Sequence, residues 1–153
     1  MGRGERPERQ ALVALGWVWR GDSVLLVRRH DPALPAAHGR WELPGGKVAF
    51  GEDPAATVAR EVAEETGYAV AVGPPLSYID SVVWEYPDRR QHVVLLVYAA
   101  TAGERRAAPA DPRVAEVAWR RPDEIDPTTA LPSVGAFLGW WREHGQLAGP
   151  PVA

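Results

Sequence analysis

The sequence contains no cysteine, and this absence removes two structural options. Neither a disulfide framework nor a thiolate metal site is available, and nothing indicates an oxidising compartment. Long apolar runs are missing as well. Residues 1–10 lack the apolar stretch of a secretory signal, and no later run approaches the roughly 18 residues of a membrane span. We therefore expect a cytosolic protein without membrane contact, whose stability comes from packing.

Positive charge is also in short supply. Lysine and arginine number 17 against 20 acidic residues, which gives a formal net charge of -3 at pH 7. Such a chain has no general attraction to duplex nucleic acid or to an anionic membrane, so any phosphate must be met by a local site. Function is therefore sought in particular groups of side chains.

The 153 residues, of which 46% are hydrophobic and 24% charged, suffice for one globular domain with a real core. No internal repeat divides the chain. Residues 1–10 are predicted to be a disordered N-terminal segment, 11–146 the domain, and 147–153 a flexible tail. The Pro- and Ala-rich stretch 101–112 is expected to be a loop.

Short apolar runs rich in β-branched or aromatic residues predict strands, and two segments with helical spacing predict helices. The expected strands span residues 11–19, 23–27, 81–85, 91–99 and 114–119, and the expected helices span 54–66 and 133–144. Gly21-Asp22 is suited to a hairpin turn after the first strand. The pattern predicts an α/β fold in which helices flank a mixed sheet.

The first predicted helix has start and stop signals at both ends. Asp53 is suited to cap the free backbone amides, Pro54 to the first helical position, and Gly67 to the left-handed residue after the last turn. Within it, Ala55, Val58 and Val62 share one face and are expected to be buried.

Three carboxylates, those of Glu61, Glu64 and Glu65, share a neighbouring arc of this helix. A solvated surface would explain an ordinary charge run, but here like charges repel at i,i+3 and i,i+4, and the helix C-terminus disfavours carboxylates. Arg60 relieves only part of this repulsion. Because a divalent cation would convert the repulsion into affinity, the arc predicts a magnesium site.

The segment before the helix contains Leu43-Pro44-Gly45-Gly46, which we expect to form a tight loop. Consecutive glycines let the backbone approach a ligand closely and point a carbonyl at it. A simple turn would explain two glycines equally well. They indicate a ligand site only because they stand at a short, fixed spacing before the acidic helix.

From Gly46 to Tyr68 the sequence resembles the Nudix box: a glycine, five residues, a glutamate, seven residues, then Arg-Glu-aliphatic-X-Glu-Glu-X-Gly-aliphatic. The matching residues are Gly46, Glu52, Arg60, Glu61, Val62, Glu64, Glu65 and Gly67. Only Tyr68 departs, since it is aromatic where the family has an aliphatic residue. So many fixed positions make this a far stronger signal than a lone glycine-rich motif.

The resemblance implies a Nudix α/β/α sandwich, with a mixed β-sheet between helices, and a hydrolase that uses Mg²⁺, with Mn²⁺ as an alternative. It also implies roles for individual residues. The implied metal ligands are Glu61, Glu64, Glu65 and the Gly45 carbonyl, and Glu52 would support the site or bind the metal through water. The implied catalytic residues are Glu61, Glu64 and Arg60, and Arg60 would orient Glu61. Metal-positioned water would attack the phosphoanhydride, so no covalent nucleophile is needed.

The implied substrate is a nucleotide, either a nucleoside triphosphate or a nucleoside diphosphate derivative. Trp84 and Tyr86 are candidates to stack on a base. Arg28 and Arg29, at the end of the second predicted strand, are candidate phosphate contacts. The segment Glu85–Arg89 is similar to part of the MutT-type enzymes, which makes Arg89 a further candidate. MutT-type enzymes that destroy oxidised guanine nucleotides place an asparagine near a late proline, where this chain has Ala130-Leu131-Pro132. The base therefore stays open.

Two other functions share this fold. A catalytically silent Nudix-fold module that binds a nucleotide and regulates a partner is the alternative, although such modules commonly lose box carboxylates that this chain keeps. Isopentenyl diphosphate isomerases are expected to use a cysteine, which is absent. The sequence leaves a homodimer open, and it does not identify which flexible acid among Glu85, Asp88, Glu104, Asp111 and Glu116 supplies an extra ligand or base.

Overall fold

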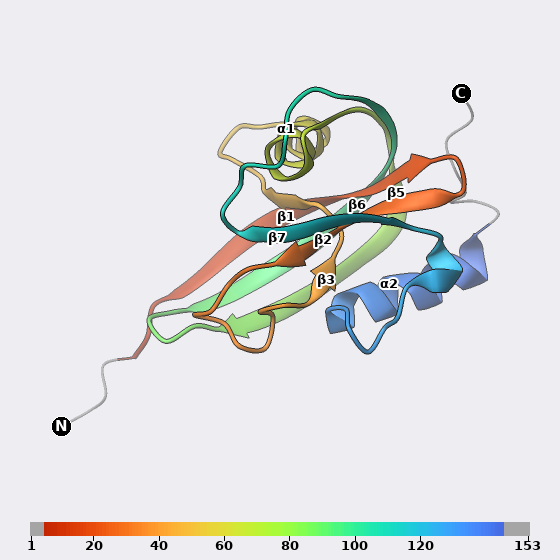
Figure 1. Ribbon diagram of the computed structural model, residues 1–153. Coiled ribbons are helices and arrows are strands. Elements are labelled where there is room, and N and C mark those ends of the chain that lie inside the picture. Colours follow the sequence, from red (N-terminus) through yellow and green to blue (C-terminus); the bar gives the residue numbers. More distant parts are fainter. Residues whose placement is uncertain (1–4, 146–153) are drawn as a thin grey trace.

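The computed structural model describes residues 5–145 and consists of one mixed sheet between two helices (Figure 1). The helices are α1 (Pro54–Thr66) and α2 (Pro132–His144), with a short 3₁₀ helix η1 (Pro122–Glu124). The strands are β1 (Glu8–Arg20), β2 (Ser23–Arg29), β3 (Trp41–Glu42), β4 (Gly45–Lys47), β5 (Tyr68–Glu85), β6 (Arg90–Arg105) and β7 (Val114–Arg120). In the described range, no helix is both long and apolar enough to cross a membrane.

A parallel pair, β1 and β6, forms the centre of the sheet, from Glu8 opposite Arg90 to Trp19 opposite Thr101. Strand β5 pairs antiparallel with β6 and forms one edge. On the other side, β2 pairs with β1 only beside their hairpin turn, and then with β3 and β7. Farther along β1, its partner is β4 instead of β2. The sheet therefore splits beside β4.

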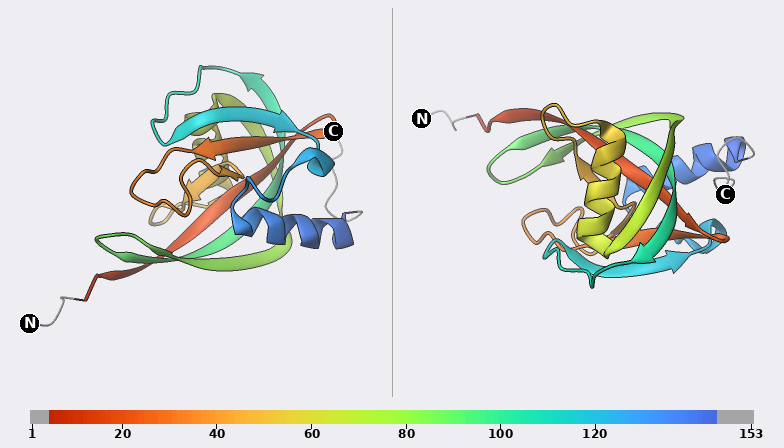
Figure 2. Two further views of the ribbon diagram at one scale, coloured as in Figure 1. Left: turned by 60° about the horizontal axis from the view of Figure 1, so that its bottom comes forward. Right: turned by 90° about the horizontal axis from the view of Figure 1, so that it is seen from above.

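Each face of the sheet has its own core, which confirms the predicted α/β/α sandwich (Figure 2). Under α1, the side chains of Val58 and Val62 are fully buried against the sheet. Under α2 the core is aromatic, with Trp17 packed edge-on against Phe137 at 4.8 Å between ring centroids. The aromatic pairs add directional contacts to the apolar burial.

The signals at both ends of α1 are confirmed. The Asp53 carboxylate accepts a hydrogen bond from the Ala55 amide at 2.8 Å, and Pro54 is the first helical residue. At the other end, Gly67 adopts φ 81°, a left-handed conformation that favours glycine, and its amide donates to the Ala63 carbonyl. These local contacts fix where the acidic arc of the helix begins and ends.

The sheet extends beyond several predicted limits. Residues 8–10 were predicted to be disordered, but they belong to β1 and pair with β6; residues 101–105 of the predicted loop belong to β6. Strand β5 begins at Tyr68 and passes through Pro74 and Pro75, with register shifts on both sides of Pro75. Prolines are tolerated there because an edge strand need not donate on its outer side. The predicted tail, 147–153, lies outside the described residues.

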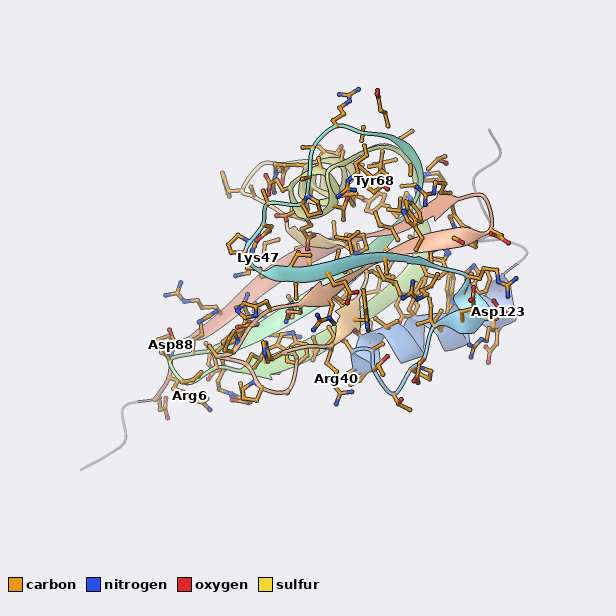
Figure 3. All side chains as sticks on the ribbon, viewed as in Figure 1. Arg6, Arg40, Lys47, Tyr68, Asp88 and Asp123 are labelled. Carbon is orange, nitrogen blue, oxygen red and sulfur yellow. The ribbon has the colours of Figure 1, made fainter. Side chains whose placement is uncertain are left out.

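The predicted tight loop at Gly45-Gly46 is instead the short strand β4. Its three residues pair antiparallel with β1, with Gly46 opposite Ala14. At the far end of the molecule, Arg6 lies beside the β5–β6 turn that carries Asp88, and its guanidinium contacts the Tyr86 carbonyl and the Glu85 carboxylate (Figure 3). Side-chain contacts thus secure the start of the described chain.

Candidate functional site

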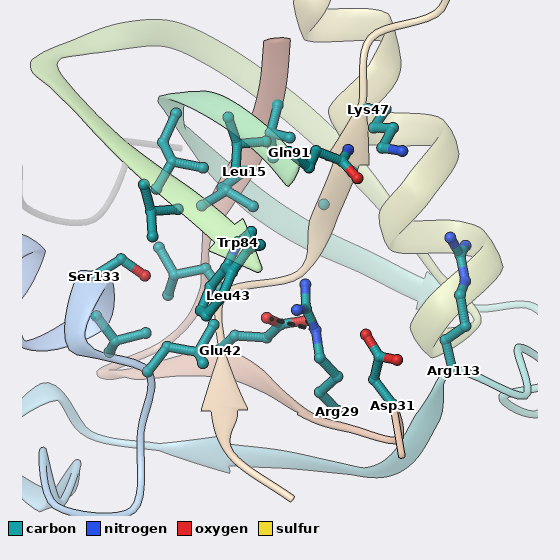
Figure 4. Close-up of a pocket in the computed structure, with 18 of the residues that line it drawn as sticks. Leu15, Arg29, Asp31, Glu42, Leu43, Lys47, Trp84, Gln91, Arg113 and Ser133 are labelled. Atoms are coloured by element: carbon teal, nitrogen blue, oxygen red, sulfur yellow. Dashed lines mark hydrogen bonds and ion pairs between the residues drawn. The ribbon is translucent and has the colours of Figure 1, made fainter. Parts of the chain in front are cut away.

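A cavity of about 670 Å³ opens on the α2 face of the sheet, beside the split at β4 (Figure 4). Its apolar lining comes mainly from β1, β5, β6 and α2. Polar side chains come from the end of β2, from β3, β4 and α1, from the β5–β6 turn, and from single positions on β6, before β7 and on α2. Its polar lining residues are Arg29, His30, Asp31, Glu42, Lys47, Glu61, Glu65, Asp88, Arg89, Gln91, Arg113 and Ser133.

Two glycines allow acidic side chains of α1 to reach this cavity. Gly45 has φ 148°, and a β-carbon there would collide with the Ala14 carbonyl. A β-carbon on Gly46 would lie 2.5 Å from the Glu61 carboxyl carbon. The Gly45 amide donates to Glu65 Oε1 at 2.7 Å. Side chains at either glycine would therefore displace the carboxylates or the strand.

The carboxyl groups of Glu61 and Glu65 are unusual because both are buried. Burial raises the pKa of Glu61, although Arg60 opposes the shift, and burial raises the pKa of Glu65 well above its ordinary value despite the Gly45 hydrogen bond. The neighbouring positive charges and hydrogen bonds therefore do not fully offset the free-energy cost of burying the two charged carboxylates. Two buried oxygen donors facing one cavity form a donor set that fits a hard divalent cation.

Arg60 connects the remaining box carboxylates. Its guanidinium donates to Glu52 at 2.9 and 3.0 Å, to Glu61 at 3.1 Å and to Glu64 at 3.3 Å. Glu52 also accepts from Thr57 Oγ1 at 2.6 Å, and these bonds, those of Arg60 first, lower its pKa to about 2. Glu52 is therefore bound into a network behind the cavity wall.

The structure brings only two of the three glutamates of the predicted acidic arc to the cavity. Glu61 and Glu65 line the cavity, whereas the Glu64 side chain is 49% exposed and turned toward Arg60. Within residues 5–145, no three acidic or histidine side chains lie close enough to hold a metal ion together. A metal that uses Glu64 would require its carboxylate to turn away from Arg60.

The cavity lining also includes aromatic and charged groups from other strands. Trp84 and Tyr86 line it, and the Arg89 guanidinium lies 3.8 Å from the Tyr86 ring centroid. Arg29 pairs with Glu42 at 3.3 Å, and its Nη1 is buried without a hydrogen-bond partner. Burial raises the Glu42 pKa, although Arg29 opposes the shift. This donor is unpartnered within residues 5–145, and a ligand acceptor would reach it only after the Arg29 side chain moved.

The cavity is lined by four of the predicted substrate contacts, Arg29, Trp84, Tyr86 and Arg89, but not by Arg28. Arg28 pairs with Glu116 of β7 at 3.1 Å, while its neighbour Arg29 lines the cavity. Successive side chains of a strand point to opposite faces, so the choice between them depends on strand register.

Arg29 was predicted, together with Arg28, as a candidate phosphate contact, whereas neither Glu42 nor Arg113 was predicted to be a site residue. Glu42 stands directly before Leu43-Pro44-Gly45, and that adjacency to the glycine pair was an available signal. Arg113 precedes β7, far from the box in the sequence, and only the tertiary fold brings it to the cavity.

Replacing Glu65 with glutamine is expected to stabilise the protein in the presence of a chelator. The amide oxygen can still accept from Gly45, while the cost of a buried charge disappears. Because the folded-state pKa of Glu65 is raised, the wild type loses stability as pH rises above about 4.5, the ordinary value for this group. The gain from Glu65→Gln should therefore grow from pH 5 to pH 8. A gain of 1 kcal/mol would raise the melting temperature by about 2–4 °C.

Glu64→Gln provides the matched control on the same helix. Its side chain is 49% exposed and forms an i,i+4 pair with Arg60, an interaction worth little in water. Calorimetry of both variants should show a pH-dependent rise for Glu65→Gln and almost no change for Glu64→Gln. A lower melting temperature for Glu65→Gln at pH 8 would mean that its charge is compensated in the folded protein.

Comparison with known proteins gives one consistent result. The NUDIX domain family model matches residues 9–140. A MutT-like protein of Streptomyces ambofaciens is 34% identical over 122 residues, which cover 78% of this chain and 69% of that protein. A putative 8-oxo-dGTP diphosphatase 2 of Mycobacterium tuberculosis is 53% identical over 60 residues, which are 39% of this chain and only 41% of the mycobacterial protein.

Among solved structures, the MutT protein of Methanosarcina mazei superimposes with a TM-score of 0.66 at 25% sequence identity. The alignment covers 92% of this chain and 97% of that protein. The similarity therefore includes the sheet, both helices and the segment that carries the box.

Proposed function

The chain belongs to the Nudix hydrolase family, and on that premise we propose that it cleaves a phosphoanhydride bond of a nucleotide with magnesium-positioned water. The observation that carries the proposal is the placement of Glu61 and Glu65. Both carboxylates are buried in the wall of a cavity that is large enough for a nucleotide and is lined by aromatic and cationic side chains elsewhere.

Glu61 and Glu65 are the proposed main ligands of Mg²⁺, with Mn²⁺ as the alternative ion. Glu64 joins them when its carboxylate turns from Arg60, and the Gly45 carbonyl is a further proposed ligand. The ion, when bound, neutralises charge on the phosphate oxygens and lowers the pKa of bound water. Arg60 orients Glu61, to which it donates at 3.1 Å, and Glu52 holds Arg60 in place.

The aromatic part of the cavity is the proposed nucleoside site. Trp84 and Tyr86 offer ring faces to a base, because stacking accepts any nucleobase. In this proposal the Arg29 side chain moves so that its unpartnered Nη1 donates to a base acceptor, and Glu42 beside it accepts from Arg29. The phosphates of a nucleotide bound here would extend toward Glu61 and Glu65, which line the same cavity.

The test is a panel of nucleotides, each with Mg²⁺ and with Mn²⁺, with phosphate measured after coupling to a pyrophosphatase or a phosphatase. The panel contains 8-oxo-dGTP, because a relative bears that name, together with dGTP, ATP, ADP-ribose and a dinucleoside tetraphosphate. Metal-dependent release from at least one member supports the proposal. Binding of a nucleotide without any release would overturn it in favour of a silent nucleotide-binding module.

A further inference from the structure

Arg113 places an exposed cation beside the buried glutamates. It lines the cavity just before β7, and its Nη2 lies 3.9 Å from Glu61 Oε2. Its side chain is 70% exposed. Figure 4 shows it extending from the start of β7 toward helix α1. The exposed guanidinium therefore lies where an anion bound beside Glu61 would meet it.

Asp111 holds the base of this side chain. The carboxylate accepts from Arg113 Nε at 3.1 Å and from its Nη2 at 2.9 Å. It also accepts from the Arg113 backbone amide at 2.9 Å, and the Val114 amide donates to the Asp111 carbonyl at 3.0 Å. Within residues 5–145, Arg113 Nη1 has no hydrogen-bond partner. The turn therefore orients the guanidinium and leaves one edge unused.

Two more cations line the cavity near Arg113. These are Lys47 and Arg89, and Lys47 forms no ion pair among the described side chains. Like charges that line one cavity repel one another, and a ligand that carries several negative charges relieves this repulsion. A polyphosphate has this charge and many acceptor oxygens.

We infer that Arg113 contacts a terminal phosphate of the substrate, that Asp111 positions it, and that the substrate is a nucleoside 5′-triphosphate. The inference rests on the proposed function and deepens it. A triphosphate carries more negative charge than a diphosphate and offers one more phosphate group to Arg113, Lys47 and Arg89, which line the cavity. Arginine suits this task because its planar fork forms paired bonds with phosphate oxygens.

The test compares Arg113→Gln, Arg113→Lys and Asp111→Asn with the wild type. We expect Arg113→Gln to raise KM for the best triphosphate of the panel about ten- to hundredfold, the loss of one charge-assisted contact, with a smaller rise for the matching diphosphate. Lysine keeps the charge without the fork and should recover part of the loss. Asparagine can still accept from the Arg113 amide, so Asp111→Asn retains the turn and should give a smaller shift in the same direction.

Arg121→Gln is the matched control, because Arg121 is half exposed, pairs with Glu124 at 3.0 Å and lies outside the cavity lining. Its KM should equal that of the wild type. Calorimetric titration with inorganic triphosphate in the presence of Mg²⁺ gives a second readout that needs no turnover, and Arg113→Gln should bind this probe at least tenfold more weakly.

The outcomes separate this inference from the proposed function. Unchanged KM and unchanged triphosphate binding in Arg113→Gln would overturn the inference, even if the wild type hydrolyses nucleotides. Equal losses for triphosphate and diphosphate would overturn the terminal-phosphate assignment. If the wild type hydrolyses nothing but binds inorganic triphosphate through Arg113, the hydrolase proposal fails and the phosphate contact stands.

Discussion

Replacing Glu61 with glutamine is expected to lower kcat about 10²- to 10⁴-fold at saturating magnesium, the usual effect of losing a group that positions or activates attacking water. The structure gives the reason. Glu61 is the box carboxylate that faces the cavity and also contacts Arg60, at 3.1 Å. Its contribution should appear chiefly in the transition state, so KM should change little.

Glu52→Gln is the comparison within the same box. Glu52 touches Arg60 and Thr57 instead of the cavity, so its loss should cost less in kcat and be partly recovered at high magnesium. It should also lower the melting temperature at pH 7, because the lowered pKa, about 2, means that Glu52 stabilises the fold above about pH 4.5 and loses this effect toward pH 2.

Kinetics of both variants should therefore be measured across a magnesium titration, at a temperature well below both melting points. A kcat for Glu61→Gln within a fewfold of the wild type at saturating metal would place water activation elsewhere. Asp111, on the segment between β6 and β7, would then be the first acid to examine, since it lies beside Arg113.

Removing divalent metal is expected to abolish turnover. The candidate donors are all oxygens, and the chain has no cysteine to favour a softer ion. Dialysis against EDTA should eliminate activity, and Mg²⁺ or Mn²⁺ should restore it. Full activity in protein that elemental analysis shows to be metal-free would refute the metal assignment.

A binding readout makes this test independent of the substrate. Because a ligand that binds only the folded protein stabilises it, Mg²⁺ or Mn²⁺ should raise the melting temperature of the wild type. The effect should be much reduced in Glu65→Gln, which removes one buried donor charge. An equal rise in both proteins would show that the metal binds somewhere else.

Local signals account for what the sequence predicted well. Helix α1 was predicted because the cap at Asp53, the stop at Gly67 and the buried stripe of Val58 and Val62 lie within one short segment. The box pattern likewise depends on spacing along that same segment. Such features need no knowledge of the distant chain.

Tertiary contacts decided the rest. Whether Arg28 or Arg29 faces the cavity depends on the register of β2, and the start of β1 at Glu8 depends on its pairing with β6. The Glu64 carboxylate turns to Arg60 because Glu52 also holds that arginine. Arg113 reaches the site only through the path of the chain into β7. None of these tertiary contacts produces a periodic pattern in the sequence.

The parallel pairing of β1 with β6 also affects how the chain folds. The first strand cannot obtain its central partner until residues 90–101 have been synthesised, whereas α1 and the β5–β6 hairpin depend on nearby segments. Pairing over such a separation requires a long loop to close, and the chain loses conformational entropy before the stabilising contacts form. This slows folding. Until then, the edge of β1 that faces β6 in the folded protein has no partner, and unfinished chains can associate with one another through it. A lower rate of protein synthesis would reduce this association.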